Sequence, residues 1–166
     1  MRLFDAELAR YDWSALDCAC DKTAVHLPDD LRHLVRARSR KEAEEPRLDC
    51  HVLIQSFPQE PAVPVTSVLM AALTEEMSPG ATIACLDLLA GLVWSDDEDS
   101  EAACQEIARQ GLWSLYHQLW TGTSPDILGY AYYILRVIET DQSRLSTYIE
   151  SGQIRVPPDI TGKVFP

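Results

Sequence analysis

Hydrophobic side chains recur at helical spacing through most of the chain, and signals for β-strands are scarce. Pro28 is suited to the first turn of a helix that runs to about residue 38. Leu31, Leu34 and Val35 would lie on one face of this helix. No Asn-Gly or Asp-Gly pair marks a tight hairpin, and no segment shows sustained alternation of β-branched residues. The pattern therefore predicts an all-α chain.

A further helix start is predicted directly after this segment. Ser39 followed by Glu42 forms a capping box. Pro46 must kink this helix or delay its start, because proline lacks the amide donor and its ring clashes with the preceding turn. The apolar run over residues 50–54 is expected to continue the helix. Three prolines then separate it from a helix predicted over residues 65–77.

Helix boundaries are clearest in the second half of the chain. Ser78-Pro79 and Ser124-Pro125 each combine an N-terminal cap with a first-turn proline, and Gly122 is suited to a helix end. The helix after Ser78 is apolar nearly all round, which indicates a central buried helix. The predicted helices span residues 79–94, 101–120, 125–139 and 142–150, with an acidic loop over residues 95–100.

The two Ser-Pro helix starts lie 46 residues apart, and the residues that follow them correspond. At the same offset Leu88-Leu89 falls on Ile134-Leu135. A period of this length lies in the range of HEAT and armadillo helix pairs. We therefore expect a short HEAT-like α-solenoid of roughly seven to eight helices, with an irregular helical bundle as the alternative. Residues 1–153 are expected to form this single domain, and residues 154–166 an extended, proline-containing C-terminal tail.

Several segments share the helix-start and packing pattern of one group of proteins. Residues 23–28 end in a proline helix start, and a polar helix follows them. Residues 54–57 lead through the entry segment 60–65 into the apolar helix 68–73, and residues 85–90 begin a leucine-rich helix. With this pattern, the chain between about residues 20 and 120 resembles a loose group of bacterial HEAT-like proteins. The resemblance implies a helical-repeat fold and a binding role, since such proteins are often scaffolds and some resemble immunity proteins encoded beside secreted toxins.

Charged residues are distributed unevenly along the chain. Residues 48–108 contain no lysine or arginine but 11 acidic residues, so almost the whole net charge of −12 arises there. A strongly negative sector repels nucleic acid and anionic lipid and attracts basic surfaces. We therefore expect a basic protein partner, no nucleic acid and no membrane. The N-terminal residues also lack the apolar centre of a signal peptide, which favours a cytoplasmic location.

The densest acidic run precedes the long helix predicted over residues 101–120. It has two interpretations: a solvated loop whose acids favour the positive end of the next helix, or a phosphate-like patch that occupies the basic groove of a partner such as a nuclease. A calcium-binding EF-hand is not expected, because the sixth and twelfth positions counted from Asp96 hold Glu101 and Ile107. The predicted partner-binding acids are Asp96, Asp97, Glu98, Asp99 and Glu101.

An aromatic stripe at helical spacing accompanies this run. Trp113, Tyr116 and Trp120 lie beside the leucine stripe of the long helix, a pattern that is typical of core residues. If these side chains face solvent, they would anchor a partner beside the acidic rim. We include them among the predicted partner-binding residues, together with Trp94 at the start of the acidic loop.

Cysteine and histidine residues cluster in the first third of the chain. The spacing of Cys18-Ala19-Cys20 argues against a structural zinc site, because one residue intervenes and no second matching pair follows. Cys50 and His51 cannot form a catalytic dyad, since adjacent helical residues point about 100° apart. No nucleotide-binding, hydrolase or metalloprotease motif is present. The sequence therefore predicts no catalytic residues, no cofactor and no metal site; the metal alternative involves Cys18, Cys20, His26, Cys50 and His51.

These observations favour a partner over a reaction. The first hypothesis is a non-enzymatic protein-binding module, in its most concrete form an immunity-type inhibitor that neutralises a basic toxin such as a nuclease through the acidic surface. The second is a cytoplasmic scaffold or adaptor that uses a helical-repeat groove. The third is an enzyme with a site assembled from residues distant in sequence. The oligomeric state is left open.

Overall fold

The described chain is mostly α-helical, as the hydrophobic pattern predicts. The computed structural model describes residues 2–20 and 22–151. The predicted tail over residues 154–166 and the last residues of the predicted domain lie outside this described part. The α-helices are α1 (Leu3–Leu8), α2 (Leu27–Arg36), α3 (Arg40–Ala43), α4 (Asp49–Val52), α5 (Ala62–Ala72), α6 (Pro79–Val93), α7 (Glu98–Gln110), α8 (Leu112–Thr121), α9 (Pro125–Ile138) and α10 (Gln142–Glu150).

Four short elements accompany the helices. The 3₁₀ turns η1 (Trp13–Ala15) and η2 (Ala24–His26) flank a minimal antiparallel hairpin of β1 (Asp17–Cys18) and β2 (Lys22–Thr23). A second hairpin pairs β3 (Leu53–Ile54) with β4 (Phe57–Pro58). Each strand has two residues, so the hairpins shape local surfaces while the helices build the core.

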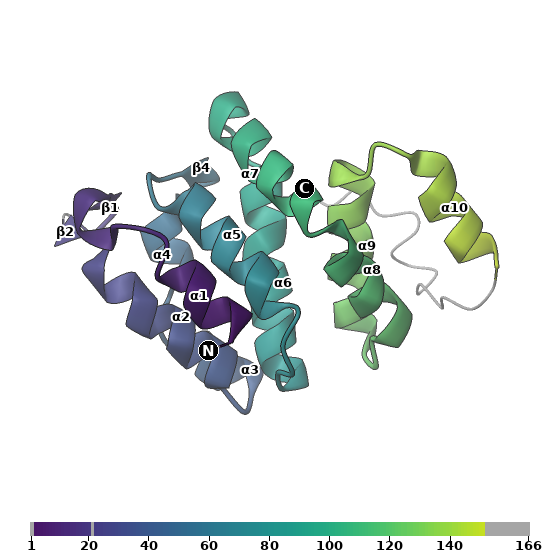
Figure 1. Cartoon of the computed structure of the whole chain (residues 1–166), viewed down its shortest axis with the longest axis horizontal. Helices are drawn as coiled ribbons and strands as arrows, with labels where there is room; N and C mark the ends of the chain where they lie inside the picture. The colour runs from purple at the N-terminus through teal and green to yellow at the C-terminus, as the bar shows by residue number, and fades with distance from the viewer. Residues whose placement is uncertain (1, 21, 152–166) are drawn as a thin grey trace.

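Neighbouring helices pack in two rows, and α6 belongs to the second row (Figure 1). In one row α5 lies between α1 and α7, and in the other α6 lies between the α2–α3 segment and α9. Helix α8 packs on α9, and α10 follows at the end of the described chain. The all-α prediction is confirmed, and the HEAT-like solenoid stays a prediction. Within the described residues, no helix is long and apolar enough to span a membrane.

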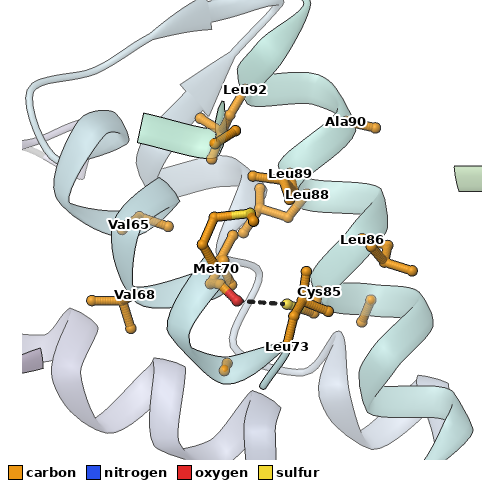
Figure 2. Packing of buried hydrophobic residues seen from close by; sticks show 14 of the residues in the cluster. Val65, Val68, Met70, Leu73, Cys85, Leu86, Leu88, Leu89, Ala90 and Leu92 are labelled. Carbon is orange, nitrogen blue, oxygen red and sulfur yellow. Dashed lines mark hydrogen bonds between the residues drawn. The ribbon is translucent and has the colours of Figure 1, made fainter. Parts of the chain in front are cut away.

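Helix α6 forms the centre of the core, as its apolar sequence predicts. Leu86, Leu89 and Leu92 are fully buried against their neighbours. Figure 2 shows Leu89 and Leu92 on the side of α6 that faces α5, whereas Leu86 points away from α5. The Cys85 thiol donates a hydrogen bond to the backbone oxygen of Leu69, 3.7 Å away, and its complete burial raises its pKa to about 12. Cys85 is therefore a packing residue, as free cysteines in cores usually are.

The predicted helix caps are present. The Ser78 hydroxyl accepts a hydrogen bond from the Ala81 amide at 3.1 Å, and the Ser124 hydroxyl accepts one from the Ile127 amide at 3.2 Å. Ser39 caps α3 in the same way. Each cap satisfies an amide that the first helical turn leaves without a backbone partner. These bonds set the starts of α6 and α9 at the predicted positions.

The long helix predicted up to Trp120 is in fact two helices. Helix α7 ends at Gln110 and α8 begins at Leu112, on either side of Gly111. Glycine has a low helix propensity, and the Ser114 hydroxyl donates to the Gly111 carbonyl at 2.6 Å. The break lets α7 pack on α5 while α8 packs on α9. The apolar spacing continues across the break, which explains why the sequence suggests one helix.

A hairpin replaces part of the helix expected over residues 50–54. Helix α4 ends at Val52, and the chain turns back between β3 and β4 through Gln55 and Ser56. These two residues have φ values of 50° and 69°, the left-handed conformation that a tight two-residue hairpin requires. Glutamine and serine are unusual there, because asparagine and glycine tolerate this conformation better. The sequence therefore lacks the usual hairpin signal.

Candidate functional site

Two acids of the acidic run between α6 and α7 form hydrogen bonds that hold the backbone in place. Asp97 is the N-cap of α7, since its side chain accepts a hydrogen bond from the Ser100 amide at 3.1 Å. Hydrogen bonds from Ser100 also lower the pKa of Asp97. Glu101 accepts a hydrogen bond from the Ser95 amide at 2.9 Å. These two acids therefore hold the backbone at the start of α7.

The acidic run extends into α7, which begins at Glu98 and not after Ser100 as predicted, and three acids of the run point to solvent. Asp96, Glu98 and Asp99 are exposed. None of the three forms an ion pair with a lysine or arginine of residues 2–20 and 22–151. Their charges are therefore uncompensated by the described neighbours.

Other acids of the basic-free stretch have cationic neighbours. Arg40 reaches Asp87 at 3.0 Å. Arg2 reaches Glu75 at 3.5 Å from the opposite end of the chain. The fold thus brings arginines from outside residues 48–108 close to some of the acids within that stretch. Five exposed acids of the stretch form no ion pair with a described lysine or arginine, and three of them lie together at the start of α7: Asp96, Glu98 and Asp99, with Glu60 and Glu76 as the other two.

Large apolar side chains lie exposed beside this loop. Trp94 is 49% exposed, and Ile54 and Phe57 of the β3–β4 hairpin are 40% and 53% exposed. The Asp96 amide donates to the Ser56 carbonyl at 2.8 Å, which fixes the hairpin against the loop. We call the exposed set of Ile54, Phe57, Trp94, Asp96, Glu98 and Asp99 the acidic aromatic surface.

A groove opens next to Trp94. It encloses about 610 Å³ and lies among α3, α4, α6 and α9. Leu48, Leu53 and Leu88 contribute apolar lining, and Asp87 contributes a carboxylate. The Trp94 ring packs against Tyr133 of α9 with ring centroids 6.0 Å apart. The groove and the acidic aromatic surface therefore share Trp94 and the β3–β4 hairpin.

The other predicted aromatic residues lie on α8, away from the acidic loop. In the chain they follow α7, which with 13 residues at 1.5 Å each is about 20 Å long. Trp113 and Trp120 are 63% and 54% exposed. Tyr116 is only 5% exposed and belongs to the core, because its hydroxyl donates to the buried Glu139 carboxylate at 2.7 Å. Tyr116 is therefore not available as a surface anchor.

Sequence reasoning missed Ile54 and Phe57 as members of the exposed surface. It assigned residue 54 to a helix and treated Phe57 as part of a connecting segment. Their shared exposure follows from the left-handed turn at Gln55 and Ser56. A local signal for that turn is missing, so only the three-dimensional structure brings the two residues to Trp94.

Four potential metal ligands converge at the β1–β2 hairpin. Cys18 and Cys20 come from the hairpin, His26 from η2 and His51 from α4. Their ligand atoms all lie within 4.8 Å of one another. Within the described residues this is the one group of three or more such side chains. Cys18 and Cys20 have no matching second pair nearby in the sequence, but the fold supplies one from two separate elements, His26 of η2 and His51 of α4.

The fifth residue of the sequence cluster points elsewhere. Cys50 is exposed and contacts Arg47, with Sγ 2.9 Å from Nη2. His51 instead faces Cys18, with 3.3 Å between Sγ and Nδ1. The two neighbours therefore diverge, as expected of adjacent helical residues. Burial raises the pKa of the Cys18 thiol, and burial together with the nearby His26 lowers the pKa of His51.

Comparison with known proteins finds no matching protein family, no similar curated protein and no similar solved structure.

Proposed function

We propose that this protein is a non-enzymatic protein-binding module that uses the acidic aromatic surface to bind a basic partner. In its most concrete form it is an immunity-type inhibitor that neutralises a basic toxin, such as a nuclease. The proposal also keeps a HEAT-like helical-repeat fold and a cytoplasmic location. The observation that carries it is the exposed Trp94 beside three exposed carboxylates without a described cationic neighbour.

The chemistry of this surface suits recognition of a basic protein. Tryptophan is enriched among the residues that dominate interface energetics, and half of the Trp94 side chain is still available for burial. The carboxylates of Asp96, Glu98 and Asp99 would attract a phosphate-binding groove and accelerate its encounter. Because Asp97 and Glu101 already hold the loop, these three charges are presented by a pre-organised backbone.

Capture from the source cells tests the proposal directly. The immobilised protein is incubated with lysate at low salt and eluted with a salt gradient, and bound proteins are identified by mass spectrometry. We expect one stoichiometric basic protein that moderate salt releases, because screening weakens exposed charge pairs. Exclusively acidic or salt-resistant partners, or no partner, would contradict the proposed mode of binding.

Charge reversal shows whether the acidic aromatic surface makes the contact. The variant Asp96→Lys/Glu98→Lys/Asp99→Lys should weaken capture of that partner by at least about 100-fold, since several steering charges change sign. A control with the same change in net charge reverses the exposed residues Glu76, Asp126 and Glu150. The proposal requires the control to keep most of its affinity. Equal losses in both variants would mean that net charge alone, and not this surface, governs binding.

A scaffold that binds through α8 is the second candidate function. The exposed Trp113 and Trp120 favour it, because two tryptophans on one short helix can anchor a partner without the acidic loop. Trp94→Ala and Trp120→Ala separate the two functions. Under the inhibitor proposal the first variant loses at least about tenfold in affinity and the second binds normally. The scaffold function predicts the reverse.

A further inference from the structure

We propose that Cys18, Cys20, His26 and His51 form a structural zinc site that ties the β1–β2 hairpin to η2 and α4. This inference is independent of the proposed binding function, because none of the four residues belongs to the acidic aromatic surface. It rests on the convergence of two thiols and two imidazoles from three elements.

Four of the six distances among the ligand atoms lie within about 0.6 Å of the edges of a zinc tetrahedron, and the other two are at most 4.8 Å. Bonds of about 2.3 Å to sulfur and 2.0–2.1 Å to nitrogen give edges of about 3.8 Å for S–S, 3.5 Å for S–N and 3.3 Å for N–N. The two sulfurs are 3.2 Å apart, and the nitrogens of His26 and His51 are also 3.2 Å apart. Cys18 Sγ lies 3.3 Å from His51 Nδ1 and 3.9 Å from His26 Nε2. A single ion at the centre would reach all four atoms with small side-chain adjustments.

The types of ligand atom favour zinc over other metal ions. Two thiolates and two imidazoles in a tetrahedron are a typical structural zinc ligand set, whereas calcium and magnesium prefer oxygen. Binding displaces one proton from each of the two thiols, so the two thiolate charges balance the charge of Zn²⁺. All four positions are filled by protein, which leaves no open position for a substrate. The site is therefore structural.

The connectivity explains what the ion would do for the fold. His51 lies 33 residues beyond Cys18 in the sequence, and its helix leads directly into the β3–β4 hairpin. The two-residue strands of β1 and β2 cannot hold this region by themselves. Zinc would fix the hairpin, η2 and α4 relative to one another. Asp30 adds a nearby negative charge, with its carboxylate 3.8 Å from His26 Nε2, and this charge favours a bound cation.

The burial of the ligands is compatible with this role. Cys18 is buried, and Cys20, His26 and His51 are partly exposed. An ion could therefore enter from solvent while its sulfur ligands remain shielded on one side. The two sulfurs are well beyond the 2.05 Å of a disulfide, and both cysteines are free thiols. An intramolecular disulfide between them is the competing chemistry.

Metal analysis of the whole chain provides the first test. Protein produced in zinc-supplemented medium is analysed by elemental mass spectrometry, and the metal-free protein is titrated with Co²⁺ under reducing conditions. We expect one zinc per chain and strong visible absorption with thiolate charge-transfer bands, the signature of tetrahedral sulfur and nitrogen coordination. A chain without zinc that binds Co²⁺ only with the weak spectrum of an octahedral ion would overturn the proposal. So would a Cys18–Cys20 disulfide in freshly purified, metal-free protein.

Matched variants assign the ligands. Cys20→Ser and His51→Ala should lower zinc affinity by about 100-fold or more, because each removes a direct ligand. Cys50→Ser and His117→Ala are controls of the same residue types at exposed positions, and they should retain one zinc per chain. Equal zinc loss from Cys50→Ser and Cys20→Ser would refute the assignment. If a ligand variant does not fold, the Co²⁺ spectrum of the unaltered protein still decides whether two thiolates bind the ion.

Discussion

At the scale of single residues, Glu7 illustrates how the fold uses a partly buried charge. Its carboxylate accepts hydrogen bonds from Arg10 at 2.7 and 2.9 Å and from Tyr11 at 3.2 Å. Ser67 of α5 donates a further short bond. Burial alone would raise the pKa of Glu7, but the hydrogen bonds from Arg10, Ser67 and Tyr11 outweigh it and lower the pKa below 4.5. Glu7 thereby ties α1 to α5.

This shift predicts a pH-dependent contribution to stability. Because the folded-state pKa is depressed, the contribution is complete above the unfolded value of 4.5 and is lost as the pH falls through the folded value. Glu7→Gln should therefore lower the free energy of unfolding by roughly 1–2 kcal/mol near pH 7, and by less near pH 3. Urea denaturation at both pH values measures this. The exposed Glu150→Gln serves as the control, and a difference that grows on acidification would refute the assignment.

Residue-level features were predictable where the relevant partners are close in sequence. The caps at Ser78 and Ser124 act on amides three residues away, so a local pattern identifies them. The Cys18 cluster depends on His51, which only the tertiary fold brings near. Spacing rules for zinc knuckles describe ligands within one or two turns, so they could not indicate that the fold brings these four side chains together.

At the scale of elements, α10 is attached to the body through a buried carboxylate. Glu139 accepts the Tyr116 hydroxyl of α8 at 2.7 Å and Arg144 of α10 at 3.3 Å. Tyr148 of α10 packs edge-on against Tyr116 with centroids 5.3 Å apart. Burial and the Glu139 carboxylate raise the pKa of Tyr116, so its hydroxyl remains a donor at any physiological pH.

Removing this carboxylate should loosen α10. Glu139→Ala leaves the Tyr116 hydroxyl buried without its acceptor and releases Arg144, so we expect a loss of about 3 kcal/mol in the free energy of unfolding. Amide hydrogen exchange in α10 should also accelerate more than exchange in α6. Glu150→Ala, an exposed change on α10 itself, is the control. Unchanged exchange in α10 would mean that its apolar contacts, such as Leu145, are sufficient to hold it.

The sequence predicts most of the helices, but it does not predict where two of them break. The apolar pattern indicates that α6 is buried nearly all round and identifies the buried face of α9. The same spacing continues through Gly111, where the chain changes packing partner from α5 to α9. The β3–β4 turn is set by contacts with α6 and the acidic loop, since Ser56 is held by the Asp96 amide. Tertiary contacts therefore decide both departures from the predicted helices.

At the scale of the whole molecule, the basic-free stretch does not produce one uniformly negative face. Arg2 and Arg40 come from outside residues 48–108 and approach Glu75 and Asp87. Composition predicted a negative sector, and three of the five exposed acids in it that form no ion pair with a described lysine or arginine follow Trp94 closely in the chain. Which arginines fold onto which acids depends on helix packing, which net charge cannot reveal. The predicted partner-binding residues therefore fall into two separate groups, one around the acidic loop and one on α8.

This localisation predicts different environments for two exposed tryptophans. Trp94 borders the acidic loop, whereas Arg144 lies 5.4 Å above the ring of Trp113. Caesium ions should gather near Trp94 and iodide should avoid it, since the local potential concentrates cations. We therefore replace Trp94 with phenylalanine and measure quenching at low salt. The fraction of fluorescence that caesium quenches should fall more than the fraction that iodide quenches. Trp113→Phe should remove relatively more of the iodide-quenchable part.

The salt dependence of quenching completes this test. Raising the ionic strength to about 0.5 M shortens the screening length to roughly 4 Å, so the preference of caesium for Trp94 should largely disappear. Neutralising Asp96, Glu98 and Asp99 to their amides should have the same effect at low salt, while leaving the iodide response of Trp113 unchanged. If caesium quenches both tryptophans equally at low salt, the negative potential is spread over the whole molecule. In that case a basic partner would have no electrostatic reason to prefer the acidic aromatic surface.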